Sequence, residues 1–236
     1  MVNAAADLKL LEIVQSCYGK DSLSRWSEEY QEVHSVREDS SKGLVLSNAS
    51  SVVVAFPGTD DCMDALLDIM AMKARTAGGR VHSGFLRAYM CLQPQLHAAL
   101  MLVSPYKSKP ITLCGHSLGG AMALLAAMDL HQWRYNVSTV VTLGSPMVGN
   151  KEWDLSLRES GIELRSYRNC GDAVPALPPM MGYMDLPGGI LLETSRTPVE
   201  GYMNPRFSLK AIKYLLTKSK DGHHLSDYKD SLNELV

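Results

Sequence analysis

Long apolar runs are missing from this sequence. No stretch approaches the roughly 18 to 20 apolar residues that a membrane-spanning helix requires, and the apolar stretch after Gly120 is interrupted by Asp129. Residues 1–14 lack a basic segment followed by an uninterrupted apolar one, so we expect no secretory signal peptide there. They have the pattern of an amphipathic helix instead. The sequence predicts a soluble or peripheral protein without a transmembrane segment.

An excess of charge of one sign is missing too. The chain has 23 Lys and Arg residues against 25 Asp and Glu residues, which gives a formal net charge of -2. No basic block stands out, and this argues against a nucleic-acid groove and against strong attraction to an anionic membrane. We therefore expect no nucleic-acid partner and favour neutral or apolar ligands.

Paired cysteines are absent as well. The five cysteines are scattered without a Cys-x-x-Cys pair: Cys17, Cys62, Cys91, Cys114 and Cys170. This spacing argues against a zinc site and favours reduced, mostly buried thiols, so we expect no metal and a cytoplasmic location. Glycosylation patterns at Asn48 and Asn136 leave secretion of a mature form open.

What the sequence does contain is enough apolar material for a sizeable core. Of its 236 residues, 46% are hydrophobic and 20% charged, which suits a single α/β domain over residues 1–236. Strand-like segments alternate with helix-like ones along most of the chain. The strand-like segments are 30–37, 43–46, 51–56, 140–143, 163–167 and parts of 182–193, and the helix-like ones are 84–103, 151–159, 209–216 and 225–235. The alternation predicts a mostly parallel central sheet flanked by helices. Residues 60–80 have interrupted helical propensity that ends at glycines.

The most informative motif lies between a strand and a helix. Residues 112–120 read TLCGHSLGG, and an apolar helix pattern follows directly. Gly115 and Gly119 leave room for a strained strand-to-helix turn that exposes the Ser117 hydroxyl, as in the nucleophile elbow of α/β-hydrolases. Ser117 is therefore the candidate nucleophile. The plainer interpretation is a glycine-rich connection with an inert serine.

A serine nucleophile needs a base, an orienting carboxylate and donors for an oxyanion. Asp172 follows a predicted strand end, where such a carboxylate belongs. The chain order of α/β-hydrolases puts the histidine after the acid, and the residues alone leave His223 and His224 equally open. His82 and His116 flank parts of the pocket, so we expect them to support it.

Two main-chain amides are the candidate oxyanion donors. One is the N–H of Leu118, next to the nucleophile. The other is the N–H of Thr59, because Gly58 allows the backbone after an early strand to turn its next amide toward the pocket. An ordinary turn after a strand is the alternative.

Several motifs occur together in a set order. They are residues 56–59 (FPGT), 81–85 (VHSGF), 115–120 (GHSLGG), 144–146 (GSP), 169–175 (NCGDAVP) and 224–228 (HLSDY). In this series the chain resembles the class 3, or fungal-lipase-like, branch of the α/β-hydrolases. The resemblance implies Ser117 as nucleophile, Asp172 as acid and His224 rather than His223 as base, because the family's histidine directly precedes a Leu-Ser pair. It also implies Thr59 and Leu118 as oxyanion donors and residues 61–79 as a lid.

The activity expected from these residues is hydrolysis of carboxylic esters of lipids, such as acylglycerols, through an acyl-enzyme. No cofactor is required, and transient contact with lipid surfaces is expected. Two alternatives stay open: a carboxylesterase acting on small or aromatic esters, and a catalytically silent binding protein on the same fold. The sequence carries no prediction of oligomeric state.

Overall fold

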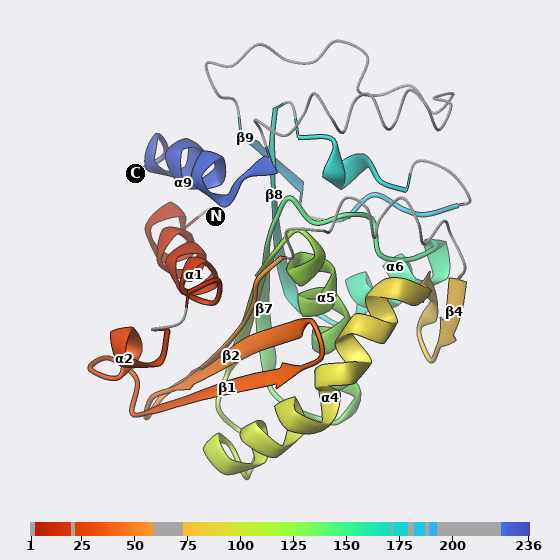
Figure 1. Ribbon diagram of the computed structural model, residues 1–236. Helices are drawn as coiled ribbons and strands as arrows, with labels where there is room; N and C mark the ends of the chain where they lie inside the picture. Colours follow the sequence, from red (N-terminus) through yellow and green to blue (C-terminus); the bar gives the residue numbers. More distant parts are fainter. Residues whose placement is uncertain are drawn as a thin grey trace.

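A seven-stranded sheet forms the centre of the protein (Figure 1). The computed structural model describes residues 3–19, 22–58, 73–170, 172–178, 182–186, 189–192 and 223–236. Across the sheet the strands are β1 (Glu32–Glu38), β2 (Ser41–Ser47), β3 (Val52–Phe56), β6 (Ile111–His116), β7 (Val137–Leu143), β8 (Glu163–Asn169) and β9 (Gly189–Leu192). β1, β2 and β3 pair antiparallel, whereas β3, β6, β7, β8 and β9 pair parallel. The mostly parallel sheet confirms the predicted fold class.

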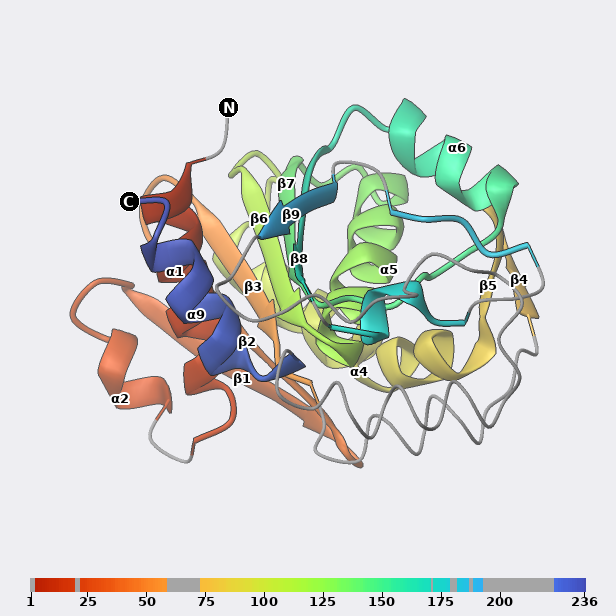
Figure 2. The same cartoon turned by 90° about the horizontal axis from the view of Figure 1, so that it is seen from above.

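Helices cover both faces of the sheet (Figures 1 and 2). On one face lie α1 (Ala4–Ser16) and α9 (Leu225–Asn233), and on the other lie α4 (Ser83–Val103), α5 (Leu118–Gln132) and α6 (Lys151–Glu159). The short α2 (Ser22–Trp26) precedes β1, and the 3-10 turn η1 (Val174–Ala176) follows β8. No helix in the described ranges is long and apolar enough to cross a membrane.

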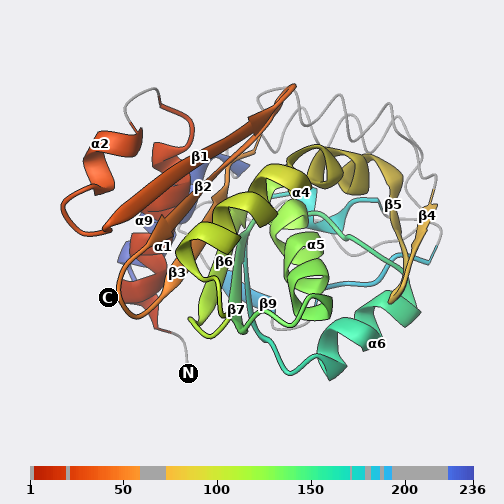
Figure 3. The same cartoon turned by 90° about the horizontal axis from the view of Figure 1, so that it is seen from below.

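The middle of the sheet is apolar on both sides. All five residues of β3 are buried, as expected for a run of β-branched residues covered on both faces. Helix α5 is buried around most of its circumference, because the sheet lies on one side of it and α4 crosses its other side (Figure 3). This packing fixes the start of α5, where Ser117 lies.

The segment 60–80 differs from the sequence prediction. Residues 73–82 form the antiparallel hairpin of β4 (Lys73–Thr76) and β5 (Gly79–His82) rather than a helix. The turn explains the difference, because the Thr76 hydroxyl binds the Gly79 carbonyl and Gly79 has a φ of +141°, which a helix does not allow. Residues 59–72, with most of the predicted lid 61–79, lie outside the described residues, as does the predicted helix 209–216.

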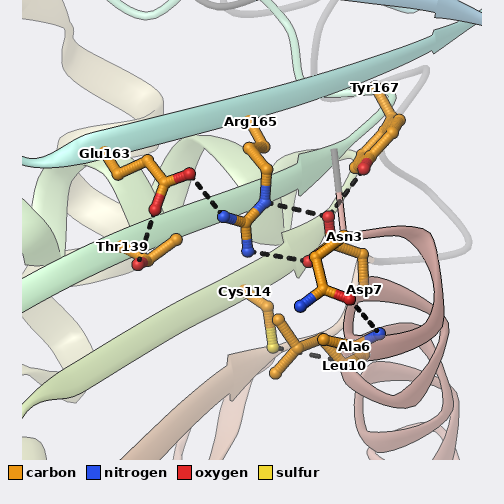
Figure 4. Close-up of polar contacts among 9 residues, drawn as sticks. All are labelled: Asn3, Ala6, Asp7, Leu10, Cys114, Thr139, Glu163, Arg165 and Tyr167. Carbon is orange, nitrogen blue, oxygen red and sulfur yellow. Dashed lines mark hydrogen bonds and ion pairs between the residues drawn. The ribbon is translucent and has the colours of Figure 1, made fainter. Parts of the chain in front are cut away.

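Helix α1 is attached to the sheet by a buried ion pair (Figure 4). The Asp7 side chain is fully buried and accepts two hydrogen bonds from Arg165 of β8, at 2.9 Å from Nε and 2.8 Å from Nη2. The Tyr167 hydroxyl donates a third at 2.6 Å. Both partners come from β8, so Asp7 fixes the position of α1 along this strand.

Four of the five cysteines lie in described ranges, and all four are free thiols. Cys17 and Cys114 are buried, whereas Cys91 and Cys170 are partly exposed. Burial raises the pKa of the Cys17 thiol to about 12 and raises that of Cys114 as well. These two thiols are therefore protonated and unreactive at neutral pH.

Candidate active site

Ser117 stands in a strained turn between β6 and α5. Its φ of 56° and ψ of -125° are unusual for a residue with a side chain. A Cβ at Gly115 would lie 2.1 Å from the Gly119 carbonyl oxygen, and one at Gly119 would lie 2.2 Å from the carbonyl oxygen of Phe56. Both positions therefore require glycine. The predicted elbow is confirmed, and its glycines serve the close approach of three backbone segments.

Three side chains from distant parts of the sequence form a hydrogen-bonded series. His223 Nε2 lies 2.8 Å from Ser117 Oγ, and His223 Nδ1 lies 2.8 Å from Asp172 Oδ2. Ser117 follows β6, Asp172 follows β8, and His223 precedes α9. These distances allow the imidazole to take the hydroxyl proton while the carboxylate holds its other nitrogen.

The prediction of His224 as the base is wrong, because His223 occupies that place. His224 is exposed and is the N-cap residue of α9, where its carbonyl accepts hydrogen bonds from the N–H groups of Asp227 and Tyr228. Its backbone is extended, with φ -68° and ψ 144°. Adjacent residues in such a backbone point in different directions, so only one of the two rings faces Ser117.

Asp172 is held in one orientation by three donors. Its Oδ2 accepts from the Tyr228 hydroxyl at 2.6 Å as well as from His223, and its Oδ1 accepts from the Val174 N–H at 2.9 Å. Asp172 is buried and Tyr228 has no exposed surface. Tyr228 belongs to the motif at residues 224–228, which by itself does not indicate a contact with the acid. Because Tyr228 belongs to α9, the same helix start determines the positions of His223 and of the tyrosine.

His116 contacts the main chain of His223, and His82 lies at the start of α4. His116 Nε2 lies 2.8 Å from the His223 carbonyl oxygen, and burial lowers the pKa of His116 to about 3. The neighbouring His223 contributes to this lowering of the pKa. The ring is therefore neutral at physiological pH. His82 caps α4, with Nδ1 accepting from the Gly84 N–H, and its ring stacks on Phe85.

Of the two predicted oxyanion donors, the structure describes Leu118 but not Thr59. Leu118 is the first residue of α5, and the first N–H groups of a helix have no partner within the helix. Thr59 lies outside the described residues. Gly58, before it, is close to the nucleophile, since a Cβ there would lie 3.1 Å from Ser117 Cβ. The donor roles of Thr59 and Leu118 stay predictions.

Comparison with known proteins points to one family. The family described as lipase (class 3) matches residues 53–182, which include Ser117 and Asp172. A lipase of Rhizomucor miehei is 33% identical over 137 residues, which cover 55% of this chain and 38% of that protein. Phospholipase A1-II 2 of Oryza sativa subsp. indica is 28% identical over 195 residues, or 66% of this chain and 48% of the relative.

Solved structures show the same fold. The triacylglyceride lipase of Rhizomucor miehei superposes with a TM-score of 0.67 at 24% identity, covering 81% of each chain. Lipase II of Rhizopus niveus gives a TM-score of 0.64 at 25% identity, covering 80% of this chain and 81% of its own. The chain spans only 35 to 38% of the length of the Rhizomucor and Rhizopus lipases that it matches in sequence. The family match over more than half of the chain nevertheless settles its membership: this protein belongs to the class 3 lipase family.

Proposed function

We propose that this protein is a serine hydrolase that cleaves carboxylic esters of lipids through an acyl-enzyme. The observation that carries the proposal is the hydrogen-bonded series from Ser117 through His223 to Asp172, with 2.8 Å at each step. Membership of the class 3 lipase family supports the same chemistry.

In the proposed mechanism each group has one role. Ser117 Oγ attacks the ester carbonyl while His223 Nε2 removes its proton. The protonated imidazole then gives this proton to the departing alcohol, which leaves an acyl group on Ser117. Asp172 accepts the Nδ1–H of His223 and stabilises the imidazolium. A water molecule, activated by the same imidazole, releases the fatty acid and restores the serine.

The negative charge that develops on the carbonyl oxygen needs fixed donors. The Leu118 N–H at the start of α5 and the Thr59 N–H, directly after Gly58, are proposed for this role. The closeness of Gly58 to Ser117 supports Thr59, and the position of Leu118 at a helix N-terminus supports the second donor.

The substrate class is proposed from the relatives and the family. The similar proteins include fungal lipases and rice phospholipases A1, whose names point to esters with acyl chains. We propose acylglycerols or related lipids, met through transient contact with a lipid surface. A series of p-nitrophenyl esters from short to long chains, with and without dispersed triglyceride, separates this substrate class from small or aromatic esters.

Removal of the nucleophile tests the proposal. Ser117→Ala should lower kcat by about 10,000-fold or more, because it removes the hydroxyl that forms the acyl-enzyme. Ser108→Ala, at an exposed serine, is the matched control and should keep the wild-type rate. A fluorophosphonate should label the wild type and the control at Ser117 but not the Ser117→Ala variant. Retained hydrolysis by folded Ser117→Ala protein contradicts the proposal.

A further inference from the structure

We propose that Tyr18 is a positioning residue of the active site, whose hydroxyl joins the main chain at Gly58 to the main chain of His223 through the ring of His116. The proposal rests on the proposed function for its kinetic consequences. Tyr18 and His223 lie outside the family match at 53–182, so the match itself assigns neither a role.

The contacts that carry the proposal start at the Tyr18 hydroxyl. It accepts a hydrogen bond from the Gly58 N–H at 2.6 Å and lies 3.0 Å from His116 Nδ1. The other ring nitrogen of His116 lies 2.8 Å from the carbonyl oxygen of His223. Four segments far apart in the sequence are thus connected through one hydroxyl and one imidazole.

The hydrogen-bond directions along this series follow from the chemistry of the groups. A carbonyl oxygen only accepts, so His116 Nε2 carries the hydrogen and donates it to His223. Burial keeps the ring neutral, which leaves Nδ1 with a free electron pair. Nδ1 must then accept, and the Tyr18 hydroxyl donates to it while accepting from Gly58.

The two ends of the series are the parts that must be aligned for the reaction. The His223 main chain holds the imidazole that serves Ser117, and Gly58 precedes the proposed oxyanion donor Thr59. A displacement of about 1 Å in such groups can lower a rate by about 100-fold. Through these contacts the Tyr18 hydroxyl fixes the positions of both Gly58 and the His223 main chain.

Helix α1 places Tyr18 where these contacts form. The helix ends at Ser16, with Cys17 as its C-cap, and the Tyr18 ring then meets the His116 ring edge-on at a centroid distance of 6.5 Å. Lys42 lies 5.7 Å from the centre of the Tyr18 ring. Tyr18→Phe preserves these ring contacts and removes only the hydroxyl. It therefore separates the effect of the hydrogen bonds from the effect of packing.

The first test compares Tyr18→Phe with Tyr106→Phe, which removes a hydroxyl from a tyrosine that is 90% exposed. Tyr18→Phe should lower kcat on a soluble p-nitrophenyl ester by about tenfold, with KM within about twofold, because alignment is lost and substrate binding is not. The Tyr106→Phe variant should match the wild type. Equal kcat values in the two variants overturn the proposal.

The second test uses the ring of His116. His116→Gln keeps one donor and one acceptor on its amide, whereas His116→Met has neither. The glutamine variant should retain a kcat several-fold higher than the methionine variant at similar thermal midpoints. If both lose the same activity, the ring serves only to fill space and the series has no positioning role.

A readout that needs no turnover separates this proposal from the proposed function. The proton between His223 Nδ1 and Asp172 gives a low-field proton NMR resonance, which should shift or broaden in Tyr18→Phe and stay unchanged in Tyr106→Phe. If the wild type hydrolyses no ester but Tyr18→Phe still shifts this resonance, the result contradicts the proposed function alone. An active wild type whose resonance is unaffected by Tyr18→Phe contradicts the positioning role alone.

Discussion

The two faces of the sheet are built in different ways. On the face covered by α4, α5 and α6, the core consists mainly of aliphatic residues from helices and strands. On the face covered by α1 and α9, apolar packing is combined with buried hydrogen-bonded groups, among them Asp7, Tyr167 and Tyr228. The second face also supplies the helices next to Tyr18 and His223.

Because of this difference, we expect one face mainly to determine the stability of the fold and the other also to determine the alignment of the catalytic side chains. Apolar burial is non-directional and tolerates small shifts, whereas hydrogen bonds fix distances and angles. We therefore expect substitutions of buried aliphatic residues on the α4 and α5 face, away from the start of α5 where Ser117 lies, to change the free energy of unfolding with little effect on kcat. On the α1 and α9 face, substitutions of the buried polar groups should change the positions of the catalytic side chains as well.

The largest effect on stability is expected where one partner of a buried ion pair is removed. Arg165→Met leaves the fully buried Asp7 carboxylate without its cation, which should lower the free energy of unfolding by about 3 to 5 kcal/mol. Urea denaturation measures this free energy of unfolding. The double variant Asp7→Asn with Arg165→Met removes the stranded charge and should recover much of the loss. A double variant as unstable as the single one contradicts the role of the ion pair.

On the opposite face, a large aliphatic side chain can be truncated without touching the polar network. Leu96→Ala in the fully buried side of α4 should lower the free energy of unfolding by about 3 kcal/mol through lost burial and a cavity. The kcat of the folded protein should stay within about twofold of the wild type. Met101→Ala, at a side chain 64% exposed on the same helix, should change neither quantity. A large loss of kcat in folded Leu96→Ala shows that the two faces are not separable.

The smallest expected effect is the change in the free energy of unfolding per pH unit that comes from His116. Its pKa is lowered by burial from 6.5 to about 3 in the folded protein. Between these values the unfolded chain binds a proton that the folded protein does not, so stability decreases as the pH falls below about 6.5. The contribution is at most about 1.4 kcal/mol per pH unit.

The measurement for this prediction is the free energy of unfolding from pH 7 to pH 4.5 in wild type and in His116→Gln. The wild type should lose more stability over this range than the variant, which has no titrating ring at this position. Parallel curves mean that the pKa of His116 is the same in the folded and unfolded protein, and they contradict the lowering of this pKa by burial.

The parts of the site that the sequence predicts are local in the chain. The elbow around Ser117 needs only the two glycines and a strand followed by a helix. Asp172 follows from its place after a strand, because the carboxyl ends of parallel strands meet at one edge of the sheet. The fold class follows from the alternation of strands and helices.

The parts that the sequence does not predict depend on long-range geometry. The choice between His223 and His224 is decided by where α9 begins and how Tyr228 meets Asp172, and a Leu-Ser pair after His224 pointed to the wrong residue. The hairpin at 73–82 is not predicted from the sequence, because residues 60–80 have helical propensity. Tyr18 is 98 positions from its contact His116, and no local pattern links them. The oxyanion role of Thr59, the lid and the cytoplasmic location stay predictions.

The central claim is that His223 is the base that activates Ser117, and kcat for one soluble p-nitrophenyl ester in His223→Ala and His224→Ala tests it most directly. We expect His223→Ala to lose about 10,000-fold in kcat, while His224→Ala stays within about threefold of the wild type. The reverse order, or equal losses in two folded variants, contradicts the account.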